Sequence, residues 1–334
     1  MAIAFLGIDV GKSDFHCALN VGDDVRTNHF SNSKAGFARL RSWLKNRKVR
    51  QVHACLEATG GWSDELAEDL HDHGHLVSVV NPLAIKAFGQ SELSRTKTDK
   101  ADAALIARYC AKMQPSLWQP PTKTQRRLQQ LARRRLALDE MRTQECNRLN
   151  GPGVSEVASS IESTIMFLNE QISDIDEEMR KLIDDDPTLR GRRDLLESIP
   201  GVGPRLITTL LGELPNISEF RNGKALAAFA GLCPQEVRSG TSVSASWLSR
   251  RGSSRLRRIL YMPAMVAIRV NPILKAFAER LRSSGKRWKQ VIVAVMRRLL
   301  VIAYGVLKSQ RPFDANYCRT KKSTLRDARR PILT

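Results

Sequence analysis

The chain has 334 residues, a formal net charge of +20, and a composition of 42% hydrophobic and 6% aromatic residues. This length suits two domains with real apolar cores, whereas so few aromatic residues argue against a ligand surface built from many stacked rings. Because there is no run of eighteen apolar residues and no basic start of a signal peptide, we expect no membrane span and a cytoplasmic location.

The first 120 residues alternate between strand and helix patterns. Apolar runs bounded by turn signals predict strands over Ala2–Val10, Phe15–Val21, Val25–Phe30, Val52–Glu57 and Leu76–Val80. Amphipathic spacing and capping residues predict helices over Lys34–Asn46, Ser63–Asp72, Leu83–Gln90 and Thr98–Met113. Three strands in a meander, followed by strand–helix alternation, predict an α/β domain with a mixed sheet and helices on its faces.

Four carboxylates in this part form the first candidate site. Asp9 and Glu57 end two predicted strands, and Asp99 and Asp102 stand three residues apart at the start of a helix, on one face. Such residues can converge at one edge of a sheet, where ionised carboxylates need cations to offset their charge. Mg²⁺, with Mn²⁺ as an alternative, is the expected occupant, and it would act on phosphodiesters. The competing interpretation is that Asp99 and Asp102 only stabilise the helix N-terminus.

Prolines at positions 115, 120 and 121 mark a linker to two long helices, which are broken at residues 151–153. In the second helix, apolar residues recur at spacings of three and four from Val157 to Leu182, close to a heptad repeat. The pattern fits either a helical hairpin within one chain or a coiled coil between chains. Because a seam of this length needs a partner, we expect a homo-oligomer, a dimer that assembles into a tetramer.

Positive charge is concentrated in the last part of the chain. Residues 1–189 contain 25 Lys and Arg against 26 Asp and Glu, a net of −1, whereas residues 190–334 contain 29 against 8, a net of +21. This imbalance is typical of a surface that binds a polyanion such as a nucleic acid. Binding to a membrane surface is less well supported, because the basic residues are spread over many segments instead of one amphipathic helix.

A glycine-rich turn opens this basic part. The sequence Ile199-Pro200-Gly201-Val202-Gly203 joins two predicted helices, the second of which covers Arg205–Leu214. This arrangement is typical of a helix-hairpin-helix motif, in which free amides at the start of the second helix hold a DNA phosphate. Gly201, Gly203 and Arg205 are therefore candidate nucleic-acid ligands, and a plain turn between helices is the alternative.

A serine-rich segment follows, and small hydroxyl residues stand beside arginines in it. It runs from Arg238 and Ser239 through Gly240 to Ser246, and then to Arg250 and Arg251. This composition suits phosphate contact, and one of its serines is a candidate nucleophile, although composition alone favours a flexible polar loop.

The rest of the chain is expected to be helical and basic. A helix over Ser254–Val270 begins with Arg255, Arg257 and Arg258, and the segment Lys286–Arg298 repeats the pattern of a basic entrance and an apolar body. These helices are expected to pack in a core while their arginines contact phosphates. A purely solvated basic face is the alternative.

Taken together and in order, these motifs resemble the DEDD-type insertion-sequence transposases of the one-ten family, which are bridge-RNA-guided DNA recombinases. The markers cover nearly the whole chain: Gly7-Ile8-Asp9, Glu57-Ala58-Thr59-Gly60, Asn81-Pro82, residues 97–103, residues 199–203, Phe229-Ala230-Gly231-Leu232, Ser239-Gly240 and Leu256-Arg257-Arg258. The resemblance implies a RuvC-like, ribonuclease-H-type domain over residues 1–120. It also implies a coiled-coil arm that joins protomers over residues 121–189, and a basic, mainly helical transposase domain over residues 190–334.

The resemblance also implies roles for single residues. Asp9, Glu57, Asp99 and Asp102 match the metal-binding acids of the family, and Ser239, which precedes Gly240, matches its nucleophilic serine. The implied partners are donor DNA, target DNA and a structured guide RNA. Two other functions remain open: a metal-dependent Holliday-junction resolvase that uses water as the nucleophile, and a non-catalytic DNA-binding scaffold.

Overall fold

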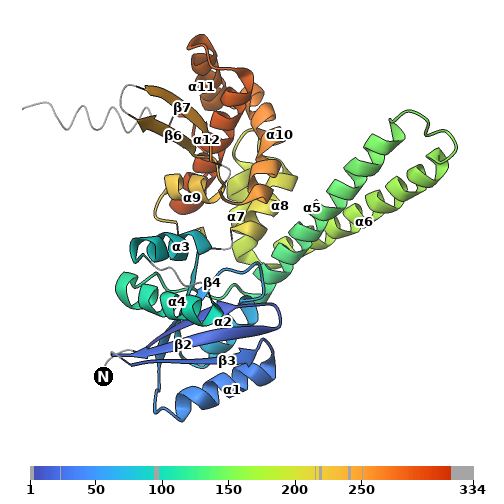
Figure 1. The fold of residues 1–334 in the computed structure, drawn as a ribbon. Coiled ribbons are helices and arrows are strands. Elements are labelled where there is room, and N and C mark those ends of the chain that lie inside the picture. Colours follow the sequence, from blue (N-terminus) through green and yellow to red (C-terminus); the bar gives the residue numbers. More distant parts are fainter. Residues whose placement is uncertain are drawn as a thin grey trace, which may run out of the picture. The chain divides into compact units, whose positions relative to one another are not determined.

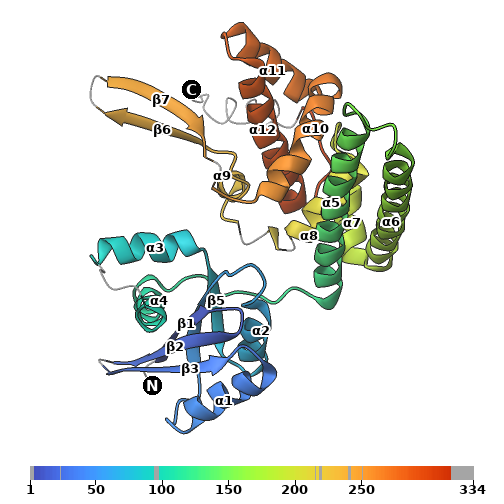
Figure 2. The same ribbon diagram turned by 45° about the vertical axis from the view of Figure 1, so that its right-hand side comes forward.

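The computed structural model describes residues 4–22, 24–93, 98–214, 216–217, 220–239, 242–249 and 251–316, with the backbone alone over 236–239 and 242–247. The chain divides into two compact units, residues 1–120 and residues 121–334. Figures 1 and 2 show the elements of both units, coloured along the sequence.

The first unit is a mixed five-stranded sheet with helices on both faces. Its elements are β1 (Ala4–Val10), β2 (Asp14–Val21), β3 (Asp24–Ser31), α1 (Lys34–Lys45), β4 (Val52–Glu57), α2 (Asp64–Asp72), β5 (Leu76–Val80), α3 (Pro82–Ser91) and α4 (Asp99–Met113). The strand order is β3-β2-β1-β4-β5, in which β1, β2 and β3 are antiparallel neighbours and β4 and β5 run parallel to β1. This is the order of the ribonuclease-H-type fold, so the fold expected for this part is confirmed.

Alternation along the strands separates the two faces of this sheet. Leu6 and Ile8 of β1 belong to the core shared with α1 and α2, whereas Gly7 between them lies under α4. A Cβ atom at Gly7 would lie 2.1 Å from the backbone nitrogen of Ala107 and 2.2 Å from the carbonyl oxygen of Ala103. Because every other residue has a Cβ atom, glycine at this position allows α4 to cross β1 this closely.

The second unit is mainly helical. Its elements are α5 (Lys123–Leu149), α6 (Ala158–Asp185), α7 (Pro187–Glu197), α8 (Pro204–Glu213), α9 (Gly223–Phe229), β6 (Pro234–Ser239), β7 (Ser242–Leu248), α10 (Ser254–Val270), α11 (Pro272–Ser283) and α12 (Trp288–Ser309). A large apolar core joins α7, α8, α10 and α12 with the base of α5, through residues such as Leu206, Leu260 and Leu299.

Helices α5 and α6 form an antiparallel hairpin that extends from the rest of this unit (Figure 1). Leu138, Leu168 and Ile172 are buried between them, so the predicted apolar seam is used within the chain along this stretch. Further along the hairpin, Met141, Met166 and Phe167 remain exposed. Of the two interpretations of the seam, the structure therefore shows the helical hairpin.

The serine-rich segment is not the flexible polar loop that its composition alone favoured. Residues Pro234–Ser239 and Ser242–Leu248 form the β-hairpin β6–β7. Serine alternates with Val243, Ala245 and Trp247 along the second of these strands. That spacing has the period of a strand, and the high serine content had favoured a loop instead.

Among the residues that the structure describes, α12 has the length and hydropathy of a membrane-spanning helix, and α10 and α11 meet that test only together, across a 95° bend. In α12, 56% of the apolar stretch is buried inside the second unit, where Val291 and Leu299 are fully buried. Arg297 and Arg298 lie near its middle. These features are typical of the central helix of a folded core.

Candidate active site

Two of the four predicted carboxylates lie at the ends of adjacent parallel strands. The register of β1 and β4 pairs Ile8 with Leu56, and Asp9 and Glu57 follow directly in their strands. Because side chains alternate along a strand, both carboxylates lie on the face opposite to the buried Ile8 and Leu56, and this is the face that α4 covers at Gly7.

The other two carboxylates lie in the first turn of α4. Thr98 caps this helix, and its hydroxyl accepts a hydrogen bond from the amide of Ala101 at 3.2 Å. Asp99 is exposed and Asp102 is half-buried. The close approach of α4 to Gly7 fixes this first turn relative to the carboxyl ends of β1 and β4.

The four acids act on one another electrostatically. Burial, and then the charges of Asp102 and Asp99, raise the pKa of Asp9, and His16 opposes this effect. Burial, and then the charges of Asp9 and Asp102, raise the pKa of Glu57. His16, which pairs with Asp9 across the sheet, has its Nδ1 atom 3.8 Å from a carboxylate oxygen of Asp99. All four predicted acids thus belong to one edge of the sheet.

The oxygen donors at this edge have the chemistry of a divalent-cation site, but their spacing in this structure is too wide to form one. Within the described parts of the chain, no three His, Cys, Asp or Glu side chains gather closely enough to hold a metal ion. Ionised carboxylates repel one another, and a cation that binds between them offsets this repulsion. Carboxylate oxygens are also the ligands that Mg²⁺ and Mn²⁺ prefer.

Three further residues at this edge were missed by the sequence analysis. The position of His16 beside Asp9 follows from the register of β1 and β2, which the local sequence does not indicate. Trp62, five residues after Glu57, is 51% exposed, and the ammonium of Lys12 lies 5.6 Å from its ring centroid. In the sequence, Gly60-Gly61-Trp62 lies three to five residues after Glu57, which ends a strand, and this tryptophan in a glycine-rich loop was the signal that could have identified it.

Ser239, the predicted nucleophile, is the last residue of β6. The backbone pairs Val237 with Ala245 and Ser239 with Ser242, so a register shift separates Val237 from Ser239. Such β-bulges are frequent next to active sites, where they redirect a side chain. Gly240, which follows Ser239 in the predicted motif, lies outside the described residues.

The predicted helix-hairpin-helix motif is formed by α7, the turn at residues 198–203 and α8. Gly201 has a φ of +94°, and a Cβ atom there would lie 2.7 Å from Ala267 of α10, so this glycine packs against the protein. The buried Asn271 side chain donates a hydrogen bond to the carbonyl of Pro200. Gly203, in contrast, caps α8 with open space around it. Gly203 is therefore the better placed of the two glycines to approach a phosphate.

Several of the predicted phosphate-binding arginines have partners inside the protein. Arg205 pairs with Asp139, Arg255 with Glu213 at 2.7 Å, and Arg258 with Glu140. Arg257 donates hydrogen bonds of 3.2 Å to the carbonyl oxygens of Ala230 and Gly252.

The other three predicted arginines differ from these. Arg251 is exposed, and no carboxylate among the described residues pairs with it. Only the backbone of Arg238 is described, and Arg250 lies outside the described residues.

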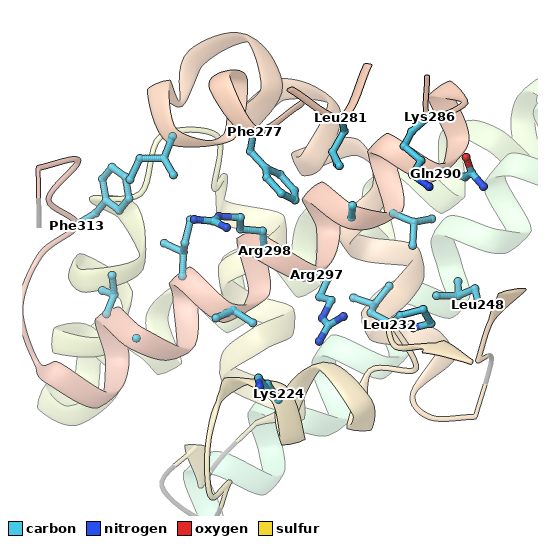
Figure 3. A pocket seen from close by; sticks show the side chains of 18 of the residues that line it. Lys224, Leu232, Leu248, Phe277, Leu281, Lys286, Gln290, Arg297, Arg298 and Phe313 are labelled. Atoms are coloured by element: carbon cyan, nitrogen blue, oxygen red, sulfur yellow. The ribbon is translucent and has the colours of Figure 1, made fainter. Parts of the chain in front are cut away.

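A pocket of about 1210 Å³ along α12 adds further basic residues (Figure 3). Among the described residues that line it, the apolar ones are aliphatic apart from Phe277 and Phe313, and there is one acid, Asp314. Six cationic side chains line the same pocket: Lys224, Lys286, Lys289, Arg297, Arg298 and Arg311. Arg298 lies over the ring of Phe277, 4.9 Å from its centroid. This surplus of positive charge favours an anionic ligand.

Comparison with known proteins gives consistent matches along the chain. Residues 6–151 match a family model described as transposase, and residues 193–279 match one described as transposase of the IS116/IS110/IS902 family. A pilin gene-inverting protein of Moraxella lacunata is 36% identical over 318 residues, which cover 94% of this chain and 98% of the relative. The transposase for insertion sequence element IS1328 of Yersinia enterocolitica is 23% identical and covers 79% of this chain and 84% of the relative.

One solved structure also matches in part. RuvC of T. thermophilus in complex with a Holliday junction substrate aligns with 34% of this chain and 96% of that chain, with 14% identity and a TM-score of 0.27. The fold assignment of the first unit therefore depends on its strand order and not on this superposition.

Proposed function

Because the chain belongs to the IS116/IS110/IS902 transposase family, we propose that it recombines DNA through a magnesium-binding acidic site and a serine nucleophile. The observation that supports the proposal most is that Asp9 and Glu57 end adjacent parallel strands, where burial, and then the charges within the set Asp9, Glu57, Asp99 and Asp102, raise the pKa values of Asp9 and Glu57. Carboxylates with perturbed pKa values cluster at functional sites of proteins.

The acidic edge is proposed to act on the scissile phosphate. Asp9 and Glu57 come from rigid strands, and Asp99 and Asp102 come from a helix fixed by its contact with Gly7, so the four oxygen donors are held by secondary structure. When bound there, Mg²⁺ or Mn²⁺ would supply charge to stabilise the transition state and the departing oxygen. The protein's part is to hold the four carboxylates at this edge, where a bound cation would favour their ionised form.

Ser239 is proposed as the nucleophile. Its hydroxyl oxygen would form a bond to phosphorus, lose its proton to solvent or a nearby base, and displace one DNA oxygen, which leaves as a free hydroxyl after protonation. The covalent phosphoserine link conserves the energy of the phosphodiester for rejoining. The β-bulge beside Ser239 and the position of this serine in the family motif support this role. The acids and Ser239 lie in different units of the chain, so the two units, from one copy or from two, must meet at one phosphate.

The relatives support recombination rather than simple cutting. The relative from Moraxella lacunata is named for the inversion of a gene, and inversion requires both cleavage and rejoining of DNA strands. Donor and target DNA are the proposed substrates, and a structured RNA of the element is proposed to select them. The RNA is supported by family resemblance alone. The excess of positive charge over residues 190–334, Arg251, Gly203 and the basic pocket along α12 support nucleic-acid binding by the second unit.

The proposed oligomer depends on the free part of the hairpin formed by α5 and α6. The exposed side chains of Met141, Met166 and Phe167 are available there for contact with a second copy. A dimer that assembles into a tetramer would also allow the acids of one copy to act with the serine of another.

The test is to trap a covalent protein–DNA adduct. The full-length protein, with Mg²⁺ and RNA transcribed from its element, is incubated with a plasmid that carries the element and its flanks, and the products are separated under denaturing conditions. We expect an adduct that disappears in Ser239→Ala and persists in the control variant Ser242→Ala, which removes the same hydroxyl from the paired strand. Asp102→Asn should abolish the adduct without abolishing DNA binding.

Other outcomes would favour the other functions. Strand cleavage without any adduct, unaffected by Ser239→Ala, would favour a resolvase that uses water. Recombination by Asp102→Asn would assign the acids a structural role. DNA binding without cleavage by the unmodified protein under all these conditions would favour a scaffold.

A further inference from the structure

An exposed tryptophan stands beside the carboxylate edge. Trp62 lies in the loop after β4, five residues beyond Glu57, and 51% of its surface is accessible. The ammonium of Lys12, three residues beyond Asp9 in the turn after β1, lies 5.6 Å from the centroid of its ring. Both residues follow acid-bearing strands at their carboxyl ends, so the pair belongs to the same edge as the acids.

The loops that carry this pair are held together by Asn32. Its side-chain amide donates hydrogen bonds of 3.0 Å to the carbonyl oxygens of Gly11 and Trp62, and its backbone amide donates one of 2.8 Å to Ser13. Asn32 follows β3, which runs parallel to β1, so its position is fixed by the same sheet. The turn with Lys12 and the loop with Trp62 thus have defined positions relative to each other.

One hydroxyl group in the loop after β4 has no hydrogen-bond partner among the described residues. The hydroxyl of Thr59, in the loop between Glu57 and Trp62, is buried without a hydrogen-bond partner among the described residues. Buried polar groups in native proteins are nearly always paired, so a water molecule or a ligand that reaches this loop would pair with the Thr59 hydroxyl. An indole with a cation over it and a free hydroxyl nearby match the base and phosphate of a nucleotide.

We propose that Trp62 and Lys12 form a nucleotide-binding subsite next to the acidic site, in which the indole stacks on an unpaired base and the Lys12 ammonium contacts a phosphate of the same strand. The inference rests on the proposed function, since it needs a DNA strand at the acidic edge. Stacking holds an unpaired base beside the scissile phosphate and tolerates any sequence, because every base has a π-face. The subsite would therefore fix the strand while sequence selection lies elsewhere.

The test is a double-mutant cycle between the protein and the DNA. Binding of the full-length protein is measured in Ca²⁺ with duplexes that contain a three-nucleotide single-stranded gap, in which each gap nucleotide in turn is replaced by an abasic one. For the unmodified protein, loss of the stacked base should weaken binding by about 5- to 150-fold at one position. Trp62→Ala should lose the same factor with the intact gap and become insensitive to the abasic change.

Matched variants separate stacking from other effects. Trp62→Phe should keep most of the coupling to the base. Trp288→Ala is the control, because Trp288 is also exposed, at 43%, and has the guanidinium of Arg282 5.5 Å from its ring centroid. It should keep the full coupling. Lys12→Met should lower the slope of log K against log salt by about 0.7, the value for one phosphate contact on a single strand.

A coupling below about twofold at every gap position, or equal loss of coupling in Trp288→Ala and Trp62→Ala, would overturn the subsite. That result is independent of the proposed function, which is tested by cleavage: if Asp102→Asn still cleaves DNA, the acidic site fails even where the stacking coupling is found.

Discussion

Substitution of Gly7 by alanine should displace α4 from the sheet and separate the acids. The added Cβ atom would lie 2.1 Å from the backbone nitrogen of Ala107, whereas ordinary contact begins near 3.4 Å, so the helix must move by the difference of 1.3 Å. The carbonyl oxygen of Ala103 is the second obstructing atom, at 2.2 Å. Because both atoms belong to the backbone, no change of side-chain rotamer relieves the clash. Overpacking costs about 1–3 kcal/mol where side chains can adjust, so we expect a loss of at least about 3 kcal/mol here.

The measurement is thermal unfolding of full-length Gly7→Ala with and without Mg²⁺. We expect a lower melting temperature for the first unit and a smaller increase on addition of Mg²⁺, because Asp99 and Asp102 move with α4 away from Asp9. Gly191→Ala is the matched control: this glycine lies within α7 with open space around its Cβ position, so alanine there should stabilise the protein by about 0.5–1 kcal/mol. If Gly7→Ala is as stable as the unmodified protein and responds equally to Mg²⁺, the close packing of α4 on β1 does not position the acids.

Three further predictions use other parts of the molecule. Asp139→Asn should lower the free energy of unfolding in urea by about 3 kcal/mol, because Asp139 is a buried carboxylate that pairs with the buried Arg135 and also with two other arginines. Asp176→Asn removes a half-exposed carboxylate that pairs with the same arginine at the same distance, and it should cost under about 1 kcal/mol. If both substitutions lowered the free energy of unfolding equally, the burial of the two carboxylates would not determine their contributions to stability. Burial and neighbouring charges raise the pKa of Asp9 in the folded state, so the protonated Asp9 stabilises the protein at low pH and this stabilisation is lost as pH rises through that pKa. In Asp9→Asn, the melting temperature of the metal-free protein should no longer fall over this pH range, and Mg²⁺ should no longer raise it. The measurement is melting temperature against pH, with and without Mg²⁺. Gly201→Ala should lower the melting temperature, because Gly201 has a positive φ and packs against α10. Gly203→Ala should leave the melting temperature unchanged and weaken DNA binding in a filter assay. If both variants lower the melting temperature, the whole turn is packed and Gly203 is not free to approach a phosphate.

The first unit was predictable from the sequence because its strands are buried and bounded by turn signals. The ranges Val52–Glu57 and Leu76–Val80 were predicted without error, and the position of Glu57 at a strand end followed from the first of them. Asp9 lies near the end of β1, as predicted. Strand alternation then places both acids on one face. The contribution of His16 depends on the register of an antiparallel pair, which no local pattern determines.

The second unit was less predictable because its arrangement depends on contacts between distant residues. Local composition identified Arg205 and Arg255 as basic residues near helix starts, but their carboxylate partners, Asp139 and Glu213, lie 66 and 42 residues away. A sequence pattern cannot distinguish an arginine that binds phosphate from one that pairs inside the protein. The role of Ser239 remains a prediction, since its position in the hairpin β6–β7 is known and its chemistry is not tested by the fold.

The ion pairs at the base of α5 have a mechanical consequence. Asp139 and Glu140 of α5 hold arginines of α8 and α10, and Glu213 of α8 holds Arg133 of α5. These ion pairs fasten the helix to the body as far as Glu140, so only residues 141–149 extend beyond them, as a stiff arm about 14 Å long. A torque applied at the far end is then delivered to α8 and α10 instead of being absorbed by a hinge.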